Sequence, residues 1–232
     1  MGGVAAAFFL YGVAFVYGAL NTTKLSAITA VLNSGATGIL RNPILVLGML
    51  LIIIGFFFKI AVVPFHMWTP DVYEGAPTVI TSYMSTALKV AAFAVFIRFA
   101  ISKNIIVSQR VGHDTIWVLA FITRTAGNLF ALVQKNIKRL LAYSAIAHTG
   151  YLMIGMLAGT KVGYSSLLLY LAAYMIMNIG AFGILSMMGG ERDRDTNIEN
   201  LTGFAQTNPW LAAALTVFLL SLAGLPPTAG FV

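Results

Sequence analysis

Two lysines lie within long apolar stretches of this chain, and their type and position suit proton transfer. Lys59 lies in ILVLGMLLIIIGFFFKIAVVPF and Lys89 in VITSYMSTALKVAAFAVFIRF. A lysine at the bilayer centre costs about 2.5–3.5 kcal/mol on insertion scales, so such residues usually face an internal polar path. Apolar surroundings also favour release of the lysine proton. The pair predicts proton handling within a membrane; the alternative is that each side chain snorkels to an interface.

Two other side chains lie in the middle of apolar stretches. His148, in LLAYSAIAHTGYLMIGML, has hydroxyl groups close by in sequence, which favours a relay role; the alternative is a structural histidine bonded to a backbone carbonyl. Arg124, in DTIWVLAFITRTAGNLFALVQ, stays protonated and cannot relay protons. Its expected role is to pair with an acid from another helix or to tune a lysine, because the sequence places no acid deep in any apolar segment.

The elements that hold these residues are predicted to be membrane helices. Hydrophobic residues make up 59% of the 232 residues and charged residues 9%, against about 25% charged in soluble domains. The composition predicts an all-α, polytopic membrane protein. The net charge of +7 is expected near lipid headgroups and gives no reason to expect nucleic acid. The chain has no cysteine, which excludes disulfides and iron–sulfur ligation, and its three histidines lack metal-ligand spacing.

Seven apolar segments approach the length that crosses a bilayer. They are expected at about 2–20, 44–63, 77–100, 115–133, 138–158, 164–188 and from 210 to the end. Both ends of the sequence are expected to lie inside a longer polypeptide. The stretch WTPDVYEGAP, with Asp71 and Glu74, is expected to be a solvated turn, and the basic cluster QKNIKR at 134–139 weakly favours a cytoplasmic position.

Prolines interrupt the second and seventh segments. Pro64 follows Lys59 by five residues, and Pro226 and Pro227 lie in LAGLPPTAGF. Interrupted helices at corresponding places in two halves of a chain indicate an inverted repeat of the transporter type. These two segments are five helices apart, which fits a five-helix repeat; the alternative is an ordinary proline kink.

Several long motifs resemble the N-subunit family of bacterial NADH:quinone oxidoreductase, respiratory complex I. They are KIAVVPFHMWTPDVYEGAPT, STALKVAAF, GNLFALVQKNIKRLLAYSAIAHTGYLMIG and SLAGLPPTAGF. The resemblance implies an antiporter-like helix bundle with inverted five-helix repeats and broken helices. Residues 1–232 would form one fragment of this membrane domain, with 1–100 ending the first repeat and 115–232 forming most of the second.

The resemblance also implies roles for individual residues. Lys59 matches a lysine of a broken helix that pairs with a glutamate of an earlier helix, which would precede residue 1. Lys89 matches a connecting lysine, and His148 matches a polar position. A further lysine would lie just beyond Val232. Arg124 stands where the family has an apolar residue.

The function implied by the resemblance is proton translocation by a subunit of an enzyme complex, driven by quinone reduction elsewhere in that complex. Its partners would be other membrane-arm subunits and the lipid bilayer of the inner (plasma) membrane. NAD, FMN, iron–sulfur clusters and quinone would bind partner subunits, with no cofactor in this chain. One alternative is a subunit of a multisubunit cation/proton antiporter. Another is a haem-binding cytochrome. Such a protein needs two histidines at matching depths on facing helices, and only His148 is clearly mid-membrane in this sequence.

Overall fold

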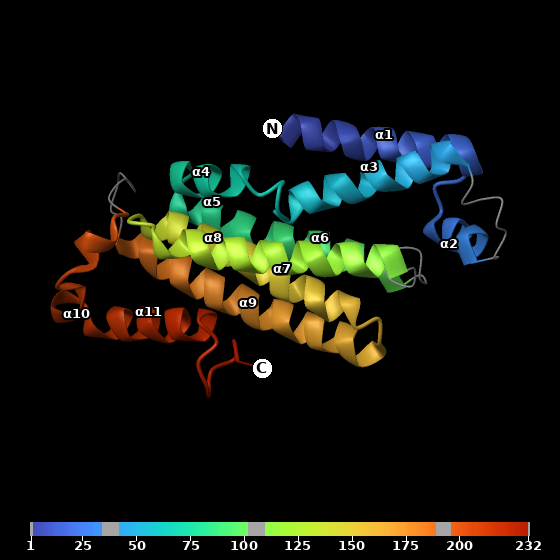
Figure 1. The fold of residues 1–232 in the computed structure, drawn as a ribbon. Coiled ribbons are helices and arrows are strands. Elements are labelled where there is room, and N and C mark those ends of the chain that lie inside the picture. The colour runs from blue at the N-terminus through green and yellow to red at the C-terminus, as the bar shows by residue number, and fades with distance from the viewer. Residues whose placement is uncertain (1, 34–41, 102–109, 189–195, 232) are drawn as a thin grey trace.

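The computed structural model describes residues 2–33, 42–101, 110–188 and 196–231, which fold into a bundle of helices (Figure 1). In chain order the elements are α1 (Gly2–Leu20), α2 (Leu25–Asn33), α3 (Pro43–Lys59), α4 (Trp68–Gly75), α5 (Thr78–Tyr83), the π-helical turn η1 (Met84–Leu88), α6 (Lys89–Ile101), α7 (Arg110–Leu132), α8 (Ile137–Leu157), α9 (Lys161–Met188), the 3-10 turn η3 (Ile198–Leu201), α10 (Phe204–Thr207) and α11 (Pro209–Leu222).

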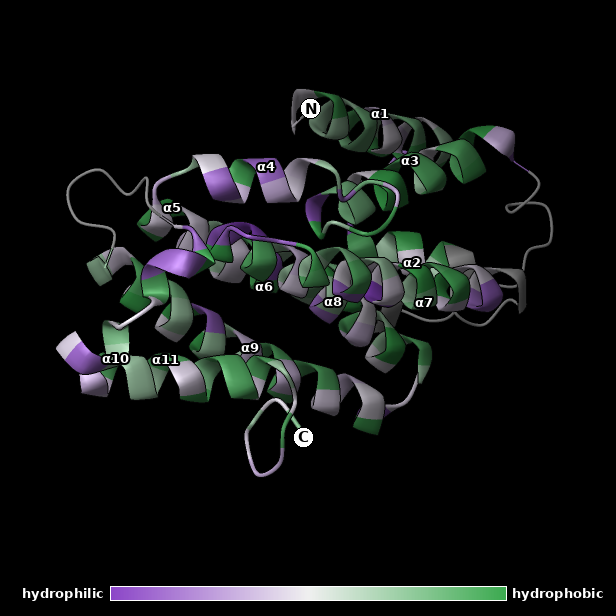
Figure 2. Cartoon of the chain, turned by 60° about the vertical axis from the view of Figure 1, so that its left-hand side comes forward, coloured by the Kyte–Doolittle hydropathy of each residue, from purple (hydrophilic) through white to green (hydrophobic). Residues whose placement is uncertain are grey.

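All seven predicted apolar segments are helical, which confirms the polytopic all-α fold. Five spans among the described residues are long and apolar enough to cross a membrane: Gly2–Leu20, Thr78–Arg98, Gly112–Leu132, Ile137–Leu157 and Lys161–Met188. Two further apolar helices, α3 and α11, are shorter. Figure 2 shows hydrophobic residues along the long helices, with hydrophilic residues on α4 and α10. The apolar outer surface is what a helix bundle in lipid requires.

Long helices pack in pairs and share two apolar cores. α1 lies along α3, α7 along α8, and α9 along α11 (Figure 1). The first core joins α1, α2, α3, α6, α7, α8 and α9, and includes the stacked rings of Phe56 and Phe96. The second joins α4, α8, α9 and α11. α8 and α9 contribute to both cores, and α8 is therefore surrounded by other helices along much of its length.

The second apolar segment is broken earlier than the sequence predicts. α3 ends at Lys59 rather than near residue 63, and residues 60–67 form turns that include Pro64. The Trp68 indole donates across this break to the Phe58 carbonyl at 3.0 Å, and the Phe58 and Trp68 rings stack. The prediction of a solvated turn at WTPDVYEGAP is wrong, because most of that stretch forms α4.

The third and seventh segments also depart from regular helix. η1 interrupts the third segment, between α5 and α6. α11 ends at Leu222, and Pro226 and Pro227 lie in the turns that follow. In these turns the chain folds back, so that the Gly230 amide donates to the Ser221 hydroxyl at 3.2 Å.

Candidate functional site

Lys89 is a buried cation at the start of α6, and only 3% of its surface is exposed. It follows η1 directly, and π-helical turns are rare features that frequently occur at functional sites. Its Nζ donates to the main-chain carbonyl of Ala145 in α8 at 2.5 Å. On another side, Nζ lies 5.4 Å from the centroid of the Tyr174 ring in α9. A carbonyl and an aromatic face thus hold this ammonium group within the bundle.

Thr149 connects the Lys89 site to the break after α3. Its hydroxyl lies 2.8 Å from the Ile60 carbonyl and 3.1 Å from the Ala145 carbonyl, the same oxygen that accepts from Lys89. A hydroxyl has one proton, so it donates to one of these carbonyls at a time. The Ile60 carbonyl needs such a donor because Pro64, four residues later, has no N–H. Thr149 therefore supports the broken segment and adjoins the buried lysine.

His148 contacts the same Tyr174 ring as Lys89 and lies among three tyrosines. Its Nδ1 is 2.6 Å from the Tyr170 hydroxyl, and its ring centroid is 5.2 Å from that of Tyr174. Tyr151 also lies against it, at a centroid distance of 6.0 Å. The structural alternative for His148, a bond to a backbone carbonyl, is not what the structure shows, since its ring nitrogen bonds to a hydroxyl that can exchange protons.

These contacts form a continuous set of buried or partly buried groups, which we call the Lys89 chain. It consists of the Ile60 carbonyl, Thr149, the Ala145 carbonyl, Lys89, Tyr174, His148 and Tyr170. It runs from the break after α3, across α8, to the middle of α9. Hydrogen bonds join Thr149, the Ala145 carbonyl and Lys89, and another joins His148 to Tyr170. Tyr174 connects these two groups only through its ring, because its buried hydroxyl has no hydrogen-bond partner among the described residues. The amine and the imidazole can each hold a proton.

A row of buried hydroxyls leads along α5 and η1 toward Lys89, and the sequence analysis did not identify it. Its members are each at most 2% exposed: Thr78, Thr81, Ser85 and Thr86. Thr81 donates to the Tyr73 carbonyl at 3.0 Å, and Thr86 donates to the Ser82 carbonyl at 2.6 Å. The signal was present in the sequence, because hydroxyl residues three or four apart in an apolar helix share a face.

The other predicted site residues are placed differently. Lys59 is the last residue of α3 and its side chain is exposed, so the expectation that it lies buried inside an apolar helix is wrong for this structure. The helix ends there because the chain turns at Ile60, whose carbonyl begins the Lys89 chain. Arg124 is also exposed, on α7, with Cζ 4.7 Å from the centroid of the Tyr151 ring.

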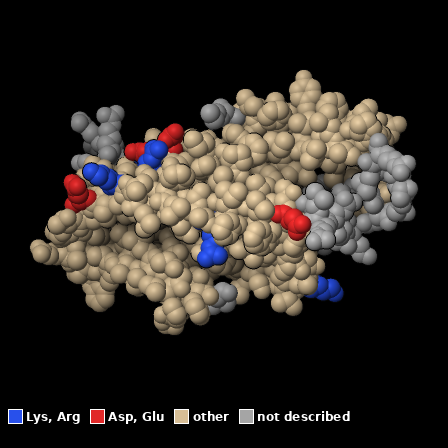
Figure 3. Space-filling model, viewed as in Figure 1, with Lys and Arg blue, Asp and Glu red and all other residues tan. Residues whose placement is uncertain are grey.

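Charged residues at the start of α8 tie α4 to the bundle. Arg139 bonds to Asp71 and Glu74 of α4, at 2.8 Å in each case. Lys138 is 1% exposed and donates to the Ala76 carbonyl at 2.7 Å. Blue and red side chains lie together over α4 and the start of α8 in Figure 3. Two residues of the basic cluster at 134–139 therefore hold α4 against the start of α8.

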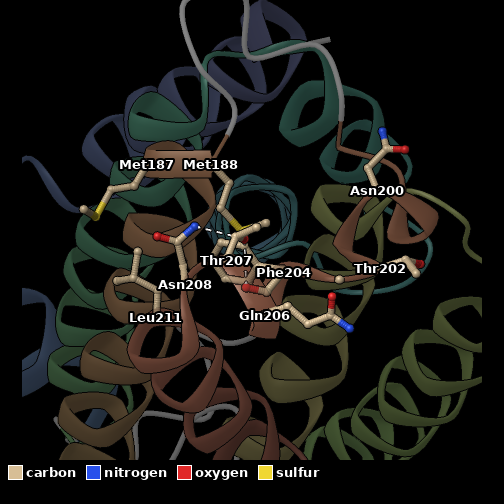
Figure 4. A pocket seen from close by; sticks show the side chains of 10 residues that line it. Met187, Met188, Asn200, Thr202, Phe204, Gln206, Thr207, Asn208 and Leu211 are labelled. Carbon is tan, nitrogen blue, oxygen red and sulfur yellow. Dashed lines mark hydrogen bonds between the residues drawn. The ribbon is translucent and has the colours of Figure 1, made fainter.

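A separate cavity of about 650 Å³ lies where α9, α10 and α11 meet (Figure 4). Its wall combines thioether and apolar groups, from Met187, Met188 and Leu211, with amides from Gln206 and Asn208. None of its lining residues belongs to the Lys89 chain. Within the described part of the chain, no three His, Asp or Glu side chains group in a way that could hold a metal ion.

Replacement of Thr149 by valine is expected to destabilise the break after α3. Valine keeps the shape but removes the one side-chain donor that the described residues place on the Ile60 carbonyl, and an unsatisfied buried acceptor costs about 1–3 kcal/mol. Thr149→Ser keeps the hydroxyl and serves as the matched control. Thermal unfolding of the complete protein in detergent measures both. Equal melting temperatures for the two variants would contradict the role given to this hydroxyl.

Broken membrane helices around buried ionisable groups define a class: a helical, multi-pass membrane protein with ionisable side chains inside its bundle. A comparison with known families makes this more specific. The chain belongs to the family described as NADH:quinone oxidoreductase/Mrp antiporter, transmembrane region, which matches residues 1–232.

Individual relatives agree with this assignment. NADH-quinone oxidoreductase subunit N of Trichlorobacter lovleyi is 44% identical, with 100% of this chain and 47% of the relative aligned. A chain of respiratory complex I from Thermus thermophilus is 40% identical and superposes with a TM-score of 0.79, covering 99% of this chain and 48% of that one. These matches confirm the N-subunit resemblance. The chain spans about half the length of these relatives.

A more distant structure supports the fold alone. A chain of the Mrp complex from a Dietzia species is 24% identical, with a TM-score of 0.86 over 99% of this chain and 41% of that one. The antiporter-like bundle predicted from the sequence is confirmed by this match.

Proposed function

We propose that the complete protein moves protons across the bacterial inner membrane as a membrane-arm subunit of NADH:quinone oxidoreductase, with this chain forming part of the path. The observation that carries the proposal is the buried Lys89, which bonds to the Ala145 carbonyl beside the Thr149 hydroxyl. A charge buried in a membrane protein is costly and is usually retained for function.

Within this proposal, Lys89 holds the proton, and His148, which bonds to the Tyr170 hydroxyl, is a second protonatable group of the same cluster. The row of hydroxyls along α5 and η1 forms an approach to Lys89 from the end of the bundle that carries α4. Lys59, at the end of α3, adjoins the same path and pairs with an acid from a part of the longer protein outside this chain. The turns at Pro64, Pro226 and Pro227 mark corresponding helix breaks, so residues 1–100 end one repeat and 115–232 form most of the next.

The driving force in this proposal comes from partner subunits. NAD, FMN, iron–sulfur clusters and quinone bind those subunits, and redox chemistry there drives proton movement here. This division fits a chain without cysteine, since iron–sulfur clusters are mostly held by cysteine thiolates. The end of the bundle that carries residues 134–139 faces the cytoplasm, and the protein is a multi-pass component of the inner membrane.

A second candidate is a subunit of a multisubunit cation/proton antiporter, favoured by the family description and by the fold match to an Mrp complex. Membrane vesicles that contain the complete protein separate the two. Proton uptake driven by NADH and abolished by an uncoupler supports the oxidoreductase assignment. Proton exchange that requires a sodium gradient and ignores NADH supports the antiporter.

Replacement of Lys59 by alanine is expected to lower NADH-driven proton uptake severalfold in such vesicles. Lys59 is the last residue of α3, next in sequence to Ile60, whose carbonyl accepts from Thr149 in the Lys89 chain. Lys59→Arg should not restore full transport, because arginine retains its proton. Lys161→Ala, at the exposed start of α9, removes the same charge elsewhere and should leave uptake unchanged. Normal uptake in Lys59→Ala membranes would remove Lys59 from the path.

A further inference from the structure

Most of the side of α7 that does not pack against α8 is exposed, and one row of residues on it is called the α7 seam. Four exposed residues, spaced four, three and four apart, form it: Trp117, Phe121, Arg124 and Asn128. The Trp117 and Phe121 rings stack 5.8 Å apart. The buried positions one residue earlier form the face toward α8: Ile116, Ala120, Thr123 and Gly127. A row with this spacing lies along one side of the helix, where a second helix can pack along it.

Arg124 places a permanent charge in the middle of this α7 seam. The guanidinium carbon lies 4.7 Å from the centroid of the Tyr151 ring. No ion pair involves it among the residues that the structure describes. Arginine stays charged under all ordinary conditions, so this group needs an anionic partner at its own depth in the membrane.

Lipid phosphate lies out of reach of this guanidinium. Arg124 is eight residues before Leu132 and twelve after Gly112, the ends of its apolar span, which correspond to about 12 Å and 18 Å along the axis at 1.5 Å per residue. Side chains on a helix point toward its N-terminus, here toward the more distant end. An arginine side chain that starts at this depth does not bridge 18 Å, so snorkelling does not solve the problem.

We propose that the α7 seam binds a transmembrane helix of a partner subunit, which places an aspartate or glutamate carboxylate against Arg124. Charge complementarity identifies the partner group, and arginine pairs with a carboxylate through two parallel hydrogen bonds. A second copy of this chain does not supply it. Four of its seven acids lie at 191–199, two on α4, and Asp114 at the start of α7.

The solved relatives are chains of multi-subunit complexes, which favours a separate polypeptide as the source of the carboxylate. Tyr151, beneath Arg124, also lies against His148, so this contact would adjoin the Lys89 chain. The inference rests on the proposed membership of a complex, but not on the proposed proton path.

The first test places a photo-crosslinking residue at Asn128 in the complete protein, in native membranes. The expected product is an adduct with another polypeptide, on a membrane peptide that contains Asp or Glu. A second site, at Ile176 on α9, is 62% exposed and measures the background of lipid labelling. An adduct at Asn128 with lipid only, or with the same polypeptide only, would overturn the proposal.

The second test changes the charge. Arg124→Glu is expected to lower retention of the crosslinked partner at least tenfold after detergent extraction, whereas Arg124→Lys retains most of it. Replacing the partner's carboxylate residue by arginine should restore retention with Arg124→Glu. Undiminished retention in Arg124→Glu complexes would refute the contact. This test measures retention of the partner and not proton uptake. A failure of this inference can therefore be told apart from a failure of the proposed proton-transport function.

Discussion

Replacement of Lys89 by methionine is expected to reduce proton translocation by the complete protein at least tenfold while its fold remains intact. Methionine fills nearly the same volume but has no exchangeable proton. The Ala145 carbonyl lies inside α8 and keeps its helical hydrogen bond from the backbone four residues later. Removal of a buried charge that lacks an acidic partner also removes a desolvation cost. NADH-driven proton uptake in vesicles, measured at equal amounts of assembled complex, is the appropriate assay.

Two further variants sharpen this result. Lys89→Arg should also fail to transport, because arginine keeps the charge but does not release its proton. The double variant of Lys59→Ala and Lys89→Met should lose little more than Lys89→Met alone, since both residues serve one path. Full transport by Lys89→Met, or strictly additive losses in the double variant, would show that Lys89 has only a structural role.

Alanine at Gly127 or Gly150 is expected to prevent close packing of α7 against α8. A Cβ at Gly127 would lie 2.6 Å from the Ala147 backbone nitrogen, and one at Gly150 would lie 2.7 Å from the Arg124 backbone nitrogen. Backbone atoms cannot rotate away as side chains do, so the two helices must separate. Such overpacking costs about 1–3 kcal/mol per site, and the losses should be non-additive because both changes separate the same pair.

The chain provides a matched control for this experiment. Gly183 lies inside α9, and a Cβ there would meet no atom within 4 Å. Gly183→Ala should therefore preserve or slightly raise the melting temperature, because alanine favours helix. Melting temperatures in detergent and the amount of assembled protein in membranes measure all three variants. Equal stability of the Gly150 and Gly183 variants would show that the α7–α8 pair tolerates separation.

Apolar segment length was the strongest signal in the sequence. It predicted every long helix, because a membrane helix must satisfy its backbone internally over about 20 residues. Segment length did not predict where the helices break. Lys59 was expected inside a helix that ends on it, and α4 was expected to be a turn. Both errors have one cause: the helix restarts through contacts between distant residues, including the Trp68 indole and the Phe58 carbonyl.

The candidate site was only partly predictable for a similar reason. Lys89 and His148 stood out because ionisable residues are rare in apolar segments. The groups that lie between Lys89, His148 and the break after α3 could not be identified from residue type. The Ala145 and Ile60 carbonyls belong to ordinary apolar residues, and no residue type announces which backbone oxygen will face a cation. The sequence identified Arg124 as unusual. Its exposed position could not be predicted, because it depends on which side of α7 packs against α8.

Main-chain oxygens accept the bonds from Lys89, Thr149 and Lys138, on Ala145, Ile60 and Ala76 respectively. Every amino acid carries such an oxygen. Evolution can therefore replace the accepting residues, within limits of size, without any compensating change in the donor. Across an alignment of relatives, the three donors would be constrained individually while showing little covariation with their acceptors. Contact prediction from correlated substitutions would detect the packing of these helices but would pass over the bonds that hold their buried cations.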